Sequence, residues 1–244
     1  MLGKPRSVWR NLIAMAVICI SLGYIEAALV VYLREILVPL RLEHFPGMTR
    51  ELLPMVSLEQ LRAAGGSYPF LLAVEVCREP APLILLAACA WAFGRAFRSS
   101  LAYFLIGFGI WDICYYASLK ILVNWPASLA TWDVLYLIPT AWVAPVWAPL
   151  AASVTMIAAG LLLLLRGPSA TWRRALTGAL LALVGAGLIL TSFLLRSAEA
   201  FERVPVRYDW QWFLGGWLLS VLGLCWGLRV RREPDGVVAT GPAQ

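Results

Sequence analysis

Six apolar runs alternate with short polar segments along the 244-residue chain. An α-helix rises 1.5 Å per residue, so about 20 apolar residues cross the hydrocarbon core of a bilayer. The pattern predicts an all-α fold, a polytopic membrane helical bundle with about six transmembrane helices in a single domain over residues 1–232. The predicted spans cover residues 12–33, 70–93, 101–123, 134–165, 175–195 and 212–228.

The fourth apolar run is overlong, and its first part is rich in proline and tryptophan. Residues 125–149 contain four tryptophans and four prolines. One interpretation is an aromatic belt at the membrane interface, followed by a proline-kinked start of the fourth helix. The other is a re-entrant or broken segment over residues 133–145 that lines a cavity, because non-helical backbone at membrane depth must be covered by protein or water.

The longest polar segment, residues 34–69, is predicted to be an external loop. Within it, Ser57 and Gln60 have the spacing of a capping box, and Gly65 and Gly66 supply a stop signal. These signals predict a short amphipathic helix over residues 58–64. At the other end of the chain, residues 233–244 are rich in Gly, Pro and Ala, and are predicted to form a disordered tail.

Three charged residues interrupt the second apolar run. Glu75, Arg78 and Glu79 fall on one face at helical spacing, and Pro80 and Pro82 follow them. Prolines cannot donate a hydrogen bond, so two backbone carbonyls lose their intrahelical partners there. Such groups cannot face lipid, and ionisable residues inside a membrane are by default a hypothesis for a functional site.

Polar residues of the first and third spans fall at a similar predicted depth, in the outer half of the bundle. We therefore expect one shared site. The candidate residues for binding a proton, a cation or another ligand are Glu26, Glu75, Arg78, Glu79, Asp112, Tyr115 and Tyr116. The candidate residues for the rim of the cavity are His44, Lys120, Asn124, Asp133 and Trp142.

The chemistry of this cluster leaves alternatives open. Four carboxylates and one arginine would carry three excess negative charges in a poorly solvated place, so at least one carboxyl group is expected to hold its proton near neutrality. That setting suits a proton relay or a cation site. Arg78 either binds the carboxylate or phosphate group of a solute, or neutralises Glu75 and pins neighbouring spans together.

Composition agrees with a membrane protein: 61% of the residues are hydrophobic and 14% are charged. Counting the loops, the tails and Lys120 near the end of the third span, eleven Lys and Arg residues lie on the predicted side of the termini and eight on the other, which predicts cytoplasmic termini. We expect an uncleaved first span and a bacterial cytoplasmic membrane. The net charge of +6 follows from these flanking residues, so no nucleic-acid partner is predicted.

Catalytic signatures are absent from the sequence. It contains no HExxH, GxSxG or Walker pattern, and its single histidine forms no ExxH motif. We predict no cofactor and no metal ligand set, and leave open an oxygen-only site for a hard cation. The five cysteines form no CxxC pair and are interpreted as core residues.

Transport or binding of a small ion or solute is the leading hypothesis, and the sequence leans against an enzyme. One alternative is an intramembrane enzyme that acts on a lipid or quinone. Another is an accessory subunit whose fifth and sixth spans hold a helix of a larger complex, because both spans carry small residues at close-packing spacing. These small residues are Gly178, Ala182, Ala186, Gly216, Ser220, Gly223 and Gly227.

Overall fold

The computed structural model describes residues 5–47, 52–166 and 171–228. Within them, four helical stretches are long and apolar enough to cross a membrane, and together they have the character of an integral membrane protein, as predicted. They are α1 (Pro5–His44), α5 (Phe97–Val123), α6 (Trp147–Leu165) and the stretch Trp172–Phe201, which contains α7 (Trp172–Leu194). Helices dominate the described chain, so the predicted all-α class fits.

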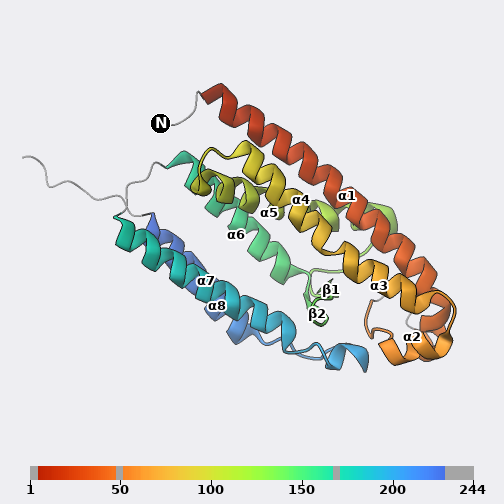
Figure 1. Cartoon of the computed structure of the whole chain (residues 1–244). Helices are drawn as coiled ribbons and strands as arrows, with labels where there is room; N and C mark the ends of the chain where they lie inside the picture. Colours follow the sequence, from red (N-terminus) through yellow and green to blue (C-terminus); the bar gives the residue numbers. More distant parts are fainter. Residues whose placement is uncertain (1–4, 48–51, 167–170, 229–244) are drawn as a thin grey trace, which may run out of the picture.

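The charged cluster of the second apolar run lies where two helices meet. α3 (Tyr68–Arg78) and α4 (Pro80–Phe93) are separated only by Glu79, because the prolines that follow remove backbone donors. Glu79 nevertheless keeps helical angles (φ −51°, ψ −40°), and its amide donates to the carbonyl of Glu75 over 3.0 Å. α3 and α4 therefore run on as one rod, visible in Figure 1.

The first helix is longer than predicted. α1 has 40 residues, or about 60 Å of helix, which is twice the ~30 Å hydrocarbon core. Residues 34–44, predicted as the first part of the external loop, are helical and continue α1 to His44.

The short helix predicted in the first external loop is confirmed. α2 (Leu58–Ala64) begins after Ser57, whose hydroxyl accepts from the amide of Gln60 at 3.2 Å. The amide of Ser57 in turn donates to Oε1 of Gln60 at 2.7 Å, which completes the capping box.

Residues 134–145 do not begin a helix, so the predicted span 134–165 is wrong in its first third. β1 (Trp132–Tyr136) and β2 (Trp142–Pro145) form an antiparallel hairpin, and α6 begins only at Trp147. The hairpin is covered on both sides: Val143 and Ala144 are fully buried, next to residues of the first external loop and of α7. A strand pair buried on both faces is apolar throughout, and therefore resembles a spanning run in the sequence.

The last two helices, α7 and α8 (Trp210–Gly227), form a closely packed pair (Figure 1). A Cβ atom on Gly223 would lie 2.6 Å from the carbonyl oxygen of Gly178, so the two backbones touch. The small-residue surfaces predicted on these spans thus pack against each other, except at Ala186, which is exposed; the neighbouring Gly185 makes the close contact with Gly216 instead. The predicted disordered tail lies outside the described residues.

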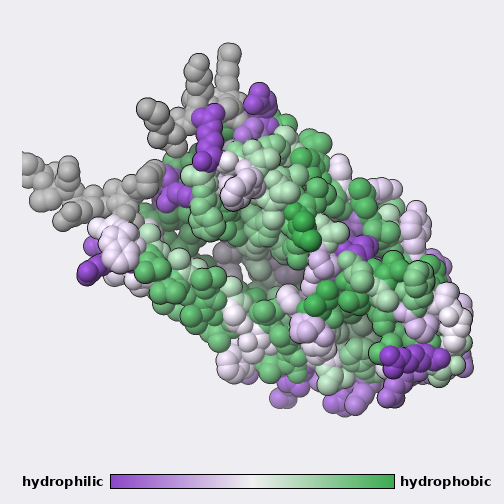
Figure 2. Space-filling view, in the orientation of Figure 1, coloured by the Kyte–Doolittle hydropathy of each residue, from purple (hydrophilic) through white to green (hydrophobic). Residues whose placement is uncertain are grey.

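Aromatic side chains join this pair to the rest of the bundle at the end farther from the termini. Trp147 of α6 stacks on Trp210 at 3.9 Å between ring centroids and meets Phe213 edge-on at 5.0 Å. Figure 2 shows that the visible face is largely hydrophobic along the helices, with hydrophilic residues gathered mainly toward the ends. Exposed residues such as Ile13, Leu183 and Leu222 are typical of a surface that contacts lipid.

Candidate functional site

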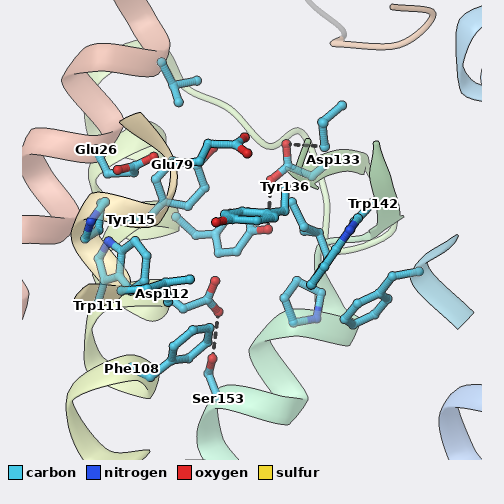
Figure 3. Close-up of a pocket in the computed structure, with 18 of the residues that line it drawn as sticks. Glu26, Glu79, Phe108, Trp111, Asp112, Tyr115, Asp133, Tyr136, Trp142 and Ser153 are labelled. Carbon is cyan, nitrogen blue, oxygen red and sulfur yellow. Dashed lines mark hydrogen bonds between the residues drawn. The ribbon is translucent and has the colours of Figure 1, made fainter. Parts of the chain in front are cut away.

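A cavity of about 230 Å³ lies between α1, the α3–α4 rod, α5, the hairpin, α6 and α7. All seven residues predicted to bind a ligand line it, and so do Asp133 and Trp142 of the predicted rim (Figure 3). Polar groups that are far apart in the sequence therefore meet in one place inside an otherwise apolar bundle.

The other three residues predicted at the rim do not line the cavity. His44 ends α1, next to the ring of Phe45. The ammonium group of Lys120 donates to the carbonyl oxygen of Pro126 at 3.0 Å, and Asn124 caps α5 in a left-handed conformation (φ 53°). These two residues shape the turn between α5 and the hairpin.

Arg78 makes four hydrogen bonds to two carboxylates. Its Nε and Nη2 donate to Glu75 at 2.9 and 2.6 Å, and its Nη1 and Nη2 donate to Glu26 at 2.8 and 2.9 Å. The guanidinium group thereby ties α3 to α1 with paired, charge-assisted hydrogen bonds. This geometry favours internal neutralisation over the alternative in which Arg78 binds an anionic solute.

Three further carboxyl groups reach the cavity with only neutral hydrogen-bond donors. Glu79 accepts from the amide of Leu137 at 3.0 Å, and Asp112 accepts from the hydroxyl of Ser153 at 2.8 Å. Asp133 accepts from the hydroxyl of Tyr116 at 2.8 Å and from its neighbouring amide, that of Val134, at 2.9 Å. The bond between Val134 and Asp133 lies within β1. Each of the other three joins two segments around the cavity.

Asp133 belongs to the hairpin and lies outside the helices that can cross the membrane. Its side chain is fully buried, and burial raises the pKa of Asp133 to about 6. The charge of Arg34 and the hydrogen bonds from Tyr116 and the Val134 amide lower this pKa in part. Asp133 therefore exchanges its proton nearer to neutrality than an ordinary aspartate does.

Two glycines set the spacing of the helices beside the site. A Cβ atom on Gly23, three residues before Glu26, would lie 2.8 Å from the carbonyl oxygen of Trp111. A Cβ atom on Gly109, three residues before Asp112, would lie 2.5 Å from the carbonyl oxygen of Ser153. Only glycine allows α1 and α6 to approach α5 this closely.

The cavity is also lined by residues that were not predicted from the sequence, among them Trp111, Tyr136 and Ser153. Ser153 is a buried hydroxyl in an apolar helix, which is a signal that could have identified it. Tyr136 lies in the segment 133–145, for which a broken segment lining a cavity was one of the two interpretations, but the residue itself was not singled out. Trp111 is next to Asp112 in the sequence, but only the packing of α5 against the neighbouring helices brings its ring to the cavity.

Two tryptophan rings flank the cavity. In Figure 3 they lie on opposite sides of it, Trp111 from α5 and Trp142 from β2. Their Nε1 atoms have no hydrogen-bond partner among the described residues and expose almost no surface. The rings therefore line the cavity, and their N–H groups do not open onto it.

No group of three or more His, Cys, Asp or Glu residues in the described parts of the chain is arranged to hold a metal ion. Comparisons of the chain with protein-family models, with curated proteins and with solved structures give no match.

Proposed function

We propose that this membrane protein has six crossings and cytoplasmic termini, and that it translocates a small cation in exchange for protons through the cavity. The observation that carries the proposal is the excess of carboxyl groups. Five of them line the cavity with one guanidinium group, and that group is paired with Glu26 and Glu75. Glu79, Asp112 and Asp133 remain without a cationic partner in the cavity lining.

Helix length and direction support the count of six crossings. The α3–α4 rod spans residues 68–93, about 39 Å of helix, and the 18 residues of α8 give about 27 Å. Both lengths are close to or above the ~30 Å hydrocarbon core. The start of α1 and the end of α8 lie at the same end of the bundle in Figure 1, as an even number of crossings requires.

Desolvation supports the exchange with protons. Several carboxylates close together in a poorly solvated cavity repel one another, so protons or a bound cation must compensate their charge. A cation that enters displaces protons, and protons that return displace the cation. This competition couples the two fluxes if the cavity opens in turn to the two sides of the membrane.

Asparagine at position 112 is expected to slow cation–proton exchange at least tenfold. An amide of nearly the same volume still accepts from Ser153, but it neither takes up a proton nor balances a cation. The assay uses proteoliposomes with a trapped pH dye, to which Na⁺, K⁺, tetramethylammonium or choline is added outside. Exchange makes the interior alkaline.

The matched control for D112N is Glu59→Gln, which removes an exposed carboxylate on α2 and should leave the rate unchanged. If the wild-type protein gives the same signal as protein-free liposomes for every cation, the proposed function is wrong.

Cation affinity is expected to fall as the pH drops through about 6. The pKa of Asp133 is raised by burial, so its carboxyl group is neutral below about pH 6 and negative above it. A negative Asp133 attracts the cation, and the neutral form does not, so the attraction is present above this pH and lost below it. Measuring affinity from pH 5 to 8 tests this, and Asp133→Asn should flatten the profile near pH 6.

A further inference from the structure

The cavity lies between helices that do not pack against each other. The α3–α4 rod packs on α5 and α1, whereas α6 packs on α5, the hairpin and α8. In the described parts of the chain, no extended packing surface joins the rod to α6 or to α7. Figure 2 shows the surface hollowed in this region, between the part of the bundle that holds the rod and the α7–α8 pair. The cavity therefore has an opening at its side, between the rod and α6–α7.

This lateral opening lies at the depth of the hydrocarbon core. On the rod, Leu83 lines the cavity about 22 Å from the first residue of α3 and about 15 Å from the last residue of α4. On α6, Ser153 lines it about 9 Å from the first residue and about 18 Å from the last. Both positions fall well inside helices that match a ~30 Å core, so lipid chains reach this side of the cavity.

The side chains at the lateral opening are apolar. Leu83 of the rod, Ala152 of α6 and Phe193 of α7 line the cavity on this side. Ile84 and Val154, which follow on the outer surface of the rod and of α6, are 67% and 59% exposed. A hydrocarbon group can pass such an opening without losing contact with apolar surface, which a hydrated metal ion cannot do.

Aromatic rings form much of the inner wall, from α5 and from the hairpin. They belong to Phe108, Trp111, Tyr115, Tyr116, Tyr136 and Trp142. Aromatic rings attract ammonium groups through cation–π interactions, most strongly when water is excluded. They also pack against methyl and methylene groups, so this wall suits a cation with an apolar body.

The carboxyl groups define where the charge of such a cation would lie. Figure 3 shows Asp112 directed into the cavity, with Glu79 and Asp133 above it. Among the described residues, Asp112 uses only Oδ2 in a hydrogen bond, and Glu79 uses only Oε2. The other oxygen of each group can attract an ammonium ion, whether or not that ion carries an N–H.

The cavity is small. At ~30 Å³ for each water molecule in the liquid, 230 Å³ corresponds to about eight waters, and it lies below the 300–1,000 Å³ of most ligand pockets. It holds an ammonium group with a short chain, and a longer chain has to continue into the lateral opening.

We propose that the cation is an alkylammonium ion that enters the cavity sideways from the bilayer. Its ammonium group lies by the carboxylates and the aromatic rings, and its hydrocarbon chain lies in the lateral opening between the rod and α6–α7. This inference rests on the proposed function, because it names the chemical class of the cation that is exchanged for protons and the route by which it arrives.

Two cations with the same head group test the role of the chain. Tetramethylammonium and hexyltrimethylammonium differ only in the length of one substituent. Each methylene group that leaves water on binding strengthens it about fourfold. Isothermal titration calorimetry of the purified full-length protein in detergent should therefore show that hexyltrimethylammonium binds at least tenfold more tightly.

Closing the lateral opening tests the position of the chain. Leu83→Trp places a larger ring there, and we expect it to weaken hexyltrimethylammonium binding at least tenfold while tetramethylammonium binding changes less than twofold. The matched control is Leu85→Trp, because Leu85 is 48% exposed on the same helix, does not line the cavity and should affect neither cation. Partitioning of the longer ion into detergent is the same for both variants, so it cancels in this comparison.

Photolabelling locates the chain in the wild-type protein without any substitution. The probe is hexyltrimethylammonium with a diazirine at the chain end, and mass spectrometry of the peptides identifies the labelled residues. We expect label within residues 82–87 of the rod or 149–156 of α6, and an excess of tetramethylammonium should suppress it. Suppressible label on the hairpin or on the first external loop instead would place the chain toward water and overturn the inference.

The outcomes separate this inference from the proposed function. Equal affinity of the wild-type protein for the two ammonium ions overturns the inference, and so does a loss of hexyltrimethylammonium binding that is the same in L83W and L85W, or an equal loss of both ions in L83W. Binding of Na⁺ or K⁺ with release of protons, but of neither ammonium ion, also overturns it and leaves the proposed function standing. If no cation binds, both are wrong.

Discussion

Replacing Arg78 by methionine is expected to lower the thermal unfolding midpoint of the purified protein by roughly 6–12 °C. The substitution leaves Glu26 and Glu75 facing each other without their cation, and their side chains are only 16% and 15% exposed. Removing one partner of a buried ion pair costs about 3 kcal/mol or more, because the remaining charge is left uncompensated. Tryptophan fluorescence during heating in detergent measures the midpoint.

A second arginine offers the control. Arg203 pairs with Glu199 but is 69% exposed, and exposed pairs contribute little, so Arg203→Met should leave the midpoint nearly unchanged. The triple variant R78M/E26Q/E75Q should recover at least half of the loss, because it has no unpaired charge. A decrease of the same size in R78M and R203M would contradict the role assigned to the pair of bonds around Arg78.

Valine in place of Gly223 is expected to separate α7 from α8. The first added carbon would already lie 2.6 Å from the carbonyl oxygen of Gly178 and 2.8 Å from the amide nitrogen of Ala182. Backbone atoms cannot move aside as a flexible side chain does, so the cost is at the upper end of the range for overpacking, about 3 kcal/mol. The expected result is a midpoint lower by roughly 6–12 °C.

Gly215→Val makes the same chemical change in the same helix. A Cβ atom at position 215 meets nothing within 4 Å. G215V therefore changes the intrinsic helix propensity as G223V does, but it leaves the packing of α7 against α8 unchanged. We expect this variant to keep a midpoint close to that of the wild-type protein. Equal effects of G223V and G215V would show that α7 and α8 are not held together by this backbone contact.

Much of the site was predictable, because charged side chains in a membrane-spanning segment are tolerated only in the protein interior. A carboxylate or guanidinium group in a spanning helix cannot face lipid, so Glu26, Arg78 and Asp112 were expected to share an interior. Spacing along each helix also indicated that they lie at a similar depth. Glu75 was predicted as a partner of Arg78, but Glu26 was not, because it is 52 residues away and only the packing of α1 against the α3–α4 rod brings it close.

The hairpin is the part of the fold that the sequence misrepresents. Val134, Val143 and their neighbours read as one continuous apolar run, and a run of this kind does not distinguish a helix from strands that are covered on both faces. The prolines at 139 and 145 indicated an interruption, but not which backbone conformation replaces the helix. Of the two interpretations of residues 133–145, a broken segment that lines a cavity is nearer to the structure, but the sequence placed Asp133 only at the rim and did not single out Tyr136.

The sequence by itself determined that this chain is a helical membrane protein with a polar site in its interior, since length, apolarity and the cost of placing charge in lipid are local properties of each segment. Only the tertiary structure decided which carboxylates Arg78 neutralises, which accept hydrogen bonds only from neutral donors in the described parts of the chain, and which aromatic rings surround them. Those features depend on side chains that are distant in the chain and meet only when the helices and the hairpin pack together.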